Sequence, residues 1–493
     1  MSDTIKLILF AIHCTGSDQY CCLSKVKKLS ILFFLGICWL PSFAQDLDSD
    51  SSRIVEIRDI HIVGNKKTKE RIITRELSVE KGEKYALKQL VDTLVFSRNL
   101  IYNTNLFNEV NVTVQEIGGG QADLLVAVSE RWYFYPLPIF KLADRNFNDW
   151  WVNQDRDFNR VKYGIKLNKF NARGRNEKLS LVLQSGFEQR FKFNYRIPYI
   201  DKKQRHGLIP EFLLITNNNL GFKTEDHLRT FLEGDKQLQT ITGGSLIHRY
   251  RKSLYDYHFL GIGIASTQIA DTIASLNPNY FGDGRTRQKS LSMFYGYQND
   301  QRNNINYPTS GHNILFTITK SGLGAFDDIN YWTLEGKFAK YSDLGKGFSL
   351  GNSVSGNVTD GIKYFYNYGG LGFLPKLYVR GYELDLIEGQ SYLLTKNSVR
   401  KLIWKHKTNI SKVMPIKQFQ TLPFAFYGKL FFDGGYVKSF EGYENNNRLT
   451  DKFIYGLGAG IDMVTMYDLV IRFEYSTNRD GENQFFLNFF ADL

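Results

Sequence analysis

The stretch Arg190-Phe191-Lys192-Phe193-Asn194-Tyr195-Arg196-Ile197 has an apolar side chain at every second position. Successive side chains of an extended strand point to opposite faces, so the four apolar residues share one face and Lys192, Asn194 and Arg196 share the other. A strand that meets lipid on one side and water on the other needs this alternation. Similar stretches recur from about residue 160 onward, and they predict a membrane-spanning β-barrel.

The composition is consistent with a barrel. The 493 residues include 29 Tyr and 38 Phe, which are favoured in strands and at membrane interfaces. The mean hydropathy of −0.31 is low for a bundle of apolar helices but suits strands that are half polar. The formal net charge is +12, yet no block of five basic residues occurs. We therefore expect no nucleic-acid partner.

The first 44 residues are typical of a secretory signal peptide. Lysines at positions 25, 27 and 28 precede an apolar stretch at 29–40, and Ser42 and Ala44 provide small residues before a cleavage site at Gln45. Residues 1–24 suggest an overextended start or a longer leader, and a buried helix at 29–40 is the alternative. All four cysteines precede Gln45, so we expect no disulfide in the mature chain. The acidic, serine-rich residues 45–53 predict a flexible lead-in.

Residues 54–131 predict a compact α+β unit. Its patterns follow the order strand, helix, helix, strand, strand, and Val110, Val112 and Val114 alternate with polar residues in the second strand. Two helices on a three-stranded sheet are enough for a small core.

The unit resembles a POTRA (polypeptide-transport-associated) domain. The resemblance rests on Gly64-Asn65-Lys66 followed by Thr68, and on Asn105-Leu106-Phe107 followed by Val110. It implies an exposed edge strand, carrying Val110, Val112 and Val114, that accepts a client strand by β-augmentation.

The rest of the chain predicts a linker and a sixteen-stranded antiparallel barrel over residues 160–493. We expect an interfacial linker at 132–159, because its Trp and Tyr residues suit a membrane–water interface, although a buried hinge would explain them equally. An even number of strands is what a single-chain barrel requires, and a pair of soluble β-sandwiches is the alternative. The strands at 160–169 and 483–493 would meet at a seam. The predicted strands are 160–169, 177–186, 188–198, 208–215, 225–233, 237–250, 255–267, 288–298, 312–320, 330–342, 346–356, 390–404, 423–437, 452–464, 467–477 and 483–493.

A long loop is predicted at 357–389, and it contains Val379-Arg380-Gly381-Tyr382. This motif resembles the loop tip of the BamA/TamA-type outer-membrane assembly family, which folds back into the barrel. Gly381 permits a tight turn, and Arg380 presents a planar fork to a carboxylate.

The resemblance also implies a partner for the arginine. Phe432-Asp433-Gly434-Gly435 is similar to the family's strand with an inward carboxylate, so Asp433 is expected to pair with Arg380 and fix the loop. Ser398 stands where the family usually has a second carboxylate, which leaves Asp433 as the principal partner.

The resemblance implies a non-enzymatic protein of a Gram-negative outer membrane, with its POTRA domain in the periplasm. It would insert client proteins into that membrane or translocate them across it. Its partners would be outer-membrane lipid and unfolded or nascent outer-membrane or secreted proteins, with accessory lipoproteins left open. A passive pore or small-molecule transporter is the alternative. The scattered histidines and the lack of a nucleophile motif predict no metal, cofactor or catalytic residue.

Overall fold

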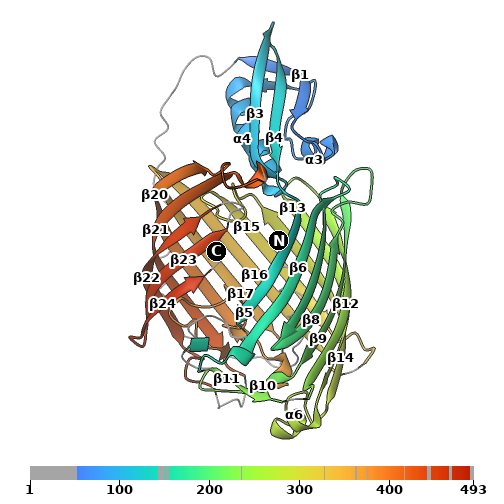
Figure 1. The fold of residues 1–493 in the computed structure, drawn as a ribbon, viewed down its shortest axis with the longest axis vertical. Coiled ribbons are helices and arrows are strands. Elements are labelled where there is room, and N and C mark those ends of the chain that lie inside the picture. The colour runs from blue at the N-terminus through green and yellow to red at the C-terminus, as the bar shows by residue number, and fades with distance from the viewer. Residues whose placement is uncertain are drawn as a thin grey trace, which may run out of the picture.

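The computed structural model describes residues 53–142, 150–151, 155–234, 236–326, 328–360, 364–374, 376–415, 417–440, 446–465 and 469–488. Figure 1 shows a small α+β domain seated on one end of a large barrel. The predicted signal peptide, nearly all of the lead-in and the end of the last predicted strand lie outside the described residues. Within the described ranges, no helix has both the length and the apolar character needed to cross a membrane.

The N-terminal domain has the predicted order of elements with one addition. Its sheet has the order β2-β1-β4-β3, in which the short strand β2 was not predicted from the sequence. Ile57, Leu90 and Val126 are buried between the sheet and the helices. The elements are β1 (Ile54–Val63), α3 (Glu70–Thr74), β2 (Lys84–Ala86), α4 (Leu87–Asn103), β3 (Phe107–Gly118) and β4 (Gln121–Glu130).

The barrel is a sixteen-stranded antiparallel sheet that runs in order from β5 to β24, which confirms the predicted fold class. Its strands are β5 (Phe134–Leu142), β6 (Val161–Ala172), β7 (Glu177–Gly186), β8 (Glu188–Arg196), β9 (His206–Asn217), β12 (Gln239–Arg251), β13 (Asp256–Ile269), β14 (Arg287–Asp300), β15 (Gly311–Ser321), β16 (Tyr331–Gly345), β17 (Phe348–Thr359), β20 (Ser391–Asn409), β21 (Thr421–Lys438), β22 (Phe453–Val464), β23 (Val470–Asn478) and β24 (Asn483–Asn488).

Two errors in the predicted strands cancel in the total. The stretch predicted at 225–233 lies outside the barrel, where β10 (Asn219–Glu225) and β11 (Leu228–Glu233) form a separate hairpin. The hairpin packs on the loop helix α6 (Asp271–Leu276) through Leu220, Phe222 and Ile273, so its apolar residues serve a local cluster rather than lipid. Figure 1 shows both at the end opposite the N-terminal domain.

The second error concerns the expected linker at 132–159, because β5 lies inside it and is the first barrel strand. Pro136 and Pro138 interrupt its pattern, and proline normally argues against a strand except at an edge. The seam therefore lies between β5 and β24, and the stretch predicted at 160–169 is the second strand, β6. In Figure 1 the sheet curls so that these end strands, teal and red, come to the same side of the cylinder.

The loop between β17 and β20 turns inward. It contains η3 (Phe365–Asn367) and a two-stranded ladder of β18 (Gly370–Leu371) and β19 (Ile387–Glu388). Val379, Arg380 and Tyr382, at its tip, are buried.

Candidate functional site: a buried arginine, a seam and a docked domain

The loop tip is pressed against the last strands of the barrel. Gly381 has a φ of +97°, a conformation that disfavours any side chain, and its carbonyl accepts a hydrogen bond from Asn478 Nδ2 at 3.0 Å. A Cβ at position 456 on β22 would overlap the Arg380 carbonyl oxygen, so Gly456 provides the space in which the tip lies.

Arg380 and Asp433 form a two-pronged contact, as the sequence led us to expect. Arg380 Nε donates to Asp433 Oδ2 at 2.7 Å, and Nη2 donates to Oδ1 at 2.6 Å. The guanidinium also stacks on the Phe431 ring, 3.8 Å from its centroid. Both charged side chains are fully buried. A buried charge needs such partners, because its desolvation costs several kcal/mol.

The second carboxylate comes from a strand that the sequence reasoning did not consider. Glu474 Oε1 on β23 lies 3.3 Å from Arg380 Nη1, whereas Ser398 offers only a hydroxyl, 3.4 Å from Nη2. Arg472-Phe473-Glu474-Tyr475 alternates charged and aromatic residues, and this pattern on a barrel strand was a signal for inward charges.

The ion pairs extend across the last strands. Lys429 lies 2.6 Å from Asp462 and 2.9 Å from Glu474, and Arg472 lies 2.7 Å from Glu474. Three cationic and three acidic side chains thus balance each other, and they tie the loop tip to β21, β22 and β23. We call this set the Arg380 cluster, which consists of Arg380, Lys429, Asp433, Asp462, Arg472 and Glu474.

A second loop contact closes the end of the barrel opposite the N-terminal domain. His227, in the β10–β11 turn, accepts from the Leu449 N–H through Nε2 at 3.1 Å, and its Nδ1 lies 3.2 Å from the Leu386 carbonyl. The neutral ring satisfies both contacts if Nδ1 carries the proton. Burial lowers the pKa of His227, while the Leu386 carbonyl opposes this shift.

The backbone of β5 is poor in donors on its seam side. Pro136 and Pro138 stand opposite Leu167 and Ile165 of β6, and neither proline can donate a hydrogen bond. They must therefore occupy non-hydrogen-bonded pairs, whose backbone groups point away from β6 and toward the seam. Among the described residues, no ladder joins β5 to β24.

The predicted client-binding strand lies at an edge, but its side chains face the other way. β3 ends the sheet of the N-terminal domain. Val110 is buried in the core, and Val112 and Val114 pack against it, so only the backbone of this edge is offered to a partner. The Val110 carbonyl already accepts from Arg98 Nε at 3.1 Å.

The N-terminal domain is docked on the rim of the barrel. Arg251, at the end of β12, binds Glu76 through two hydrogen bonds of 2.7 and 2.5 Å. Asn171 Nδ2 donates to Thr68 Oγ1 at 2.8 Å, and Asn103 Nδ2 donates to the carbonyl of another rim turn at 2.9 Å. Burial alone would raise the pKa of Glu76, but Arg251 and Arg75 reverse this and lower it.

These features define a class: a membrane β-barrel with an inward-folded arginine loop and an N-terminal α+β domain at one end. The Omp85 superfamily domain matches residues 171–489, and a POTRA domain, described as a surface antigen variable number repeat, matches residues 55–131. The chain belongs to the Omp85 superfamily, whose barrels sit in the outer membrane of Gram-negative bacteria with POTRA domains in the periplasm. Its members are non-enzymatic insertion and transport proteins.

Solved structures are similar to this chain at low sequence identity. CdiB from Escherichia coli is 9% identical with a TM-score of 0.52, and the match covers 88% of this chain and 75% of that one. BamA from Haemophilus ducreyi, lacking POTRA domains 1–3, is 12% identical with a TM-score of 0.49, over 88% and 83% of the two chains. No curated protein matches the sequence.

Proposed function

We propose that this protein inserts client proteins into the outer membrane or translocates them across it, with lateral opening between β5 and β24. The observation that carries the proposal is the seam: Pro136 and Pro138 remove donors from an edge that a closed barrel would have to pair. An edge of this kind exchanges its weak pairing for a client strand at little cost.

In this proposal the POTRA domain faces the periplasm and captures clients or partners. The free edge of β3 would pair with an extended client through backbone hydrogen bonds, beyond the carbonyl that Arg98 occupies. An accessory lipoprotein is a second candidate for this edge. The Arg380 cluster would keep the loop inside the barrel while the seam between β5 and β24 opens and closes.

Depletion of the protein from its own cells tests this function. We expect particular outer-membrane or surface proteins to disappear and to return when the wild-type chain is expressed again. A complete outer-membrane protein profile, together with reduced uptake of a small solute, would instead indicate a passive pore. Steady single-channel conductance that Arg380→Ala leaves unchanged would point the same way.

A further inference from the structure

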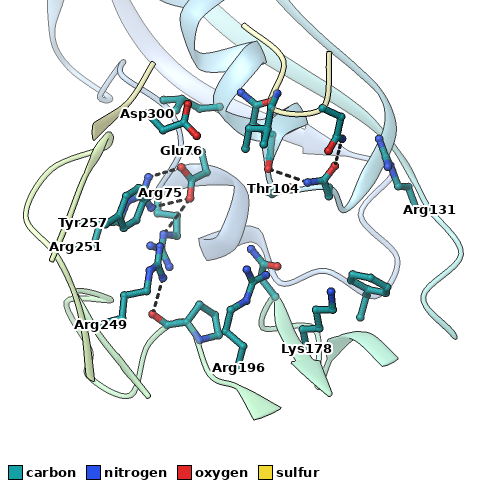
Figure 2. Close-up of a pocket in the computed structure, with 18 of the residues that line it drawn as sticks. Arg75, Glu76, Thr104, Arg131, Lys178, Arg196, Arg249, Arg251, Tyr257 and Asp300 are labelled. Atoms are coloured by element: carbon teal, nitrogen blue, oxygen red, sulfur yellow. Dashed lines mark hydrogen bonds and ion pairs between the residues drawn. The ribbon is translucent and has the colours of Figure 1, made fainter. Parts of the chain in front are cut away.

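A basic pocket lies where the POTRA domain meets the barrel. Its volume is about 460 Å³, and its described lining includes six basic side chains but two acidic ones. Figure 2 shows these side chains around the pocket, contributed by both domains. The basic residues are Arg75, Arg131, Lys178, Arg196, Arg249 and Arg251.

The two carboxylates of the pocket are already engaged. Glu76 is held by Arg251 and by Arg75, whose Nε lies 3.2 Å away. Asp300 receives two hydrogen bonds, of 2.7 and 2.6 Å, from Arg302, which is not among the lining residues. The positive charge of the pocket is therefore in excess.

Two arginines of the pocket are incompletely satisfied. Arg249 is 7% exposed, donates to the Pro198 carbonyl at 3.2 Å and lies over the Tyr257 ring. Its Nε, like that of Arg196, is buried and has no hydrogen-bond acceptor among the described residues. A buried guanidinium group in this state would be stabilised by an anion that enters the pocket.

A second pocket continues the basic surface along the inner wall beside the seam. It measures about 350 Å³, lies on β5 to β9, and shares Leu137, Lys178 and Arg196 with the first. Its described lining has six basic side chains and one acidic, Glu211, which lies 3.6 Å from Lys192. On the other side of the seam, the Arg380 cluster on β21 to β23 has equal numbers of cations and carboxylates. The excess positive charge thus belongs to the β5–β9 side of the seam, and we call the two joined pockets the basic tract.

We propose that the basic tract binds an acidic segment of an extended client polypeptide as the client approaches the seam. Arg190, Lys192 and Arg196 share one face of β8 at intervals of two and four residues, and side chains on one face of a strand repeat every ~6.6 Å. Carboxylates at alternate positions of an extended client repeat at the same distance. A small inorganic anion would occupy one point of such a surface, whereas a polypeptide would follow its length. This inference rests on the proposed function, because it names the chemistry of the client.

The test measures peptide binding to the full mature chain in nanodiscs of zwitterionic lipid. A labelled peptide in which Glu alternates with Thr should bind about tenfold tighter than the matching Gln peptide, and added salt should weaken it. Arg196→Gln and Arg249→Gln should each lower the affinity about tenfold. Lys337→Gln is the matched control, because Lys337 on β16 lines neither pocket.

Equal binding of the Glu and Gln peptides to the wild-type chain would overturn the proposal, whether or not the variants fold. Competition by inorganic phosphate at the same concentration as the peptide would also overturn it. So would vesicles of phosphatidylglycerol that bind through Arg196 when the peptide does not bind. If client assembly persists although the peptide does not bind, the proposal for the basic tract is contradicted and the proposed function is not. Peptide binding through Arg196 and Arg249 in a chain that assembles no client supports the tract and contradicts the proposed function.

Discussion

Arg380 illustrates how much a single residue depends on partners distant in sequence. Its contact with Asp433 could be predicted, because both lie in short motifs that resemble a family pattern. Its contact with Glu474 could not, because it depends on how β23 lies beside β22 and β21. Ser398 correctly indicated that one strand lacks the family's second carboxylate. The sequence did not reveal that another strand supplies this carboxylate.

Truncation of Arg380 should destabilise the barrel. Arg380→Ala leaves the buried Asp433 carboxylate without its guanidinium partner, at a cost of about 3–5 kcal/mol in the free energy of unfolding, whereas Glu474 keeps Lys429 and Arg472. Urea titration of the folded barrel, followed by its heat-modifiable electrophoretic mobility, measures this loss. Arg479→Ala, at an exposed arginine, should change the value by less than about 0.5 kcal/mol. Equal stability of the two variants would contradict the role of the Arg380 cluster.

His227 should make the closed contact between the β10–β11 turn and the loops that carry Leu386 and Leu449 sensitive to pH. Its pKa is lowered in the closed form, so closure is fully stable above the ordinary value of 6.5 and weakens as the pH falls through the lowered pKa. Arg448 and Lys452 lower the pKa of His227 further, and Asp226 raises it, each by less than burial does. Relative to an exposed reference cysteine labelled at the same pH, maleimide labelling of Leu386→Cys should be faster at pH 5 than at pH 8. If His227→Gln keeps that pH dependence, another group is responsible.

Among the elements, the strands with clear apolar–polar alternation were predictable. The strands that pack on a loop helix or form the seam edge were not. β8 shows every feature of a lipid-facing strand. The β10–β11 hairpin is apolar because it packs on α6, and β5 lacks the pattern because prolines shape its edge for the seam. Local sequence reports which faces are apolar, but not whether lipid or a neighbouring loop covers them.

Removal of the two seam prolines should tighten the barrel. Pro136→Ala together with Pro138→Ala adds two backbone donors that point toward β24, each able to contribute about 0.5–1.5 kcal/mol to pairing. The rate of client insertion into liposomes should fall. Pro423→Ala, within the internal β20–β21 ladder, is the matched control. An unchanged or faster rate in the seam variant would show that these prolines do not limit pairing.

In the whole molecule, the POTRA domain is held on the rim by a contact that no sequence pattern indicated. Glu76 and Arg251 are separated by 175 positions, and neither lies in a motif. The presence and the fold type of the two domains were predictable, because each domain has its own apolar periodicity. Their docking was not, because it depends on single polar residues of short turns.

Acid should release the docked POTRA domain. The pKa of Glu76 is lowered by Arg251 and Arg75 against the effect of burial, so docking is fully stabilised above its ordinary value of 4.5 and weakens as the pH falls through the lowered pKa. Energy transfer between dyes on the two domains reports the separation. Glu76→Gln should undock the domain at neutral pH, and Glu80→Gln, at an exposed position, should not. Unchanged transfer in Glu76→Gln would assign docking to the other rim contacts.

Locking the seam tests the central claim most directly. Residues 45–493 contain no cysteine, so cysteine pairs can scan 134–142 against 483–488 until one crosslinks. A disulfide between Leu167→Cys and Leu181→Cys, which face each other in the β6–β7 ladder, is the control. We predict that client insertion stops in the seam-locked barrel, resumes on reduction, and continues in the control. Insertion at the full rate with the seam locked would contradict lateral opening.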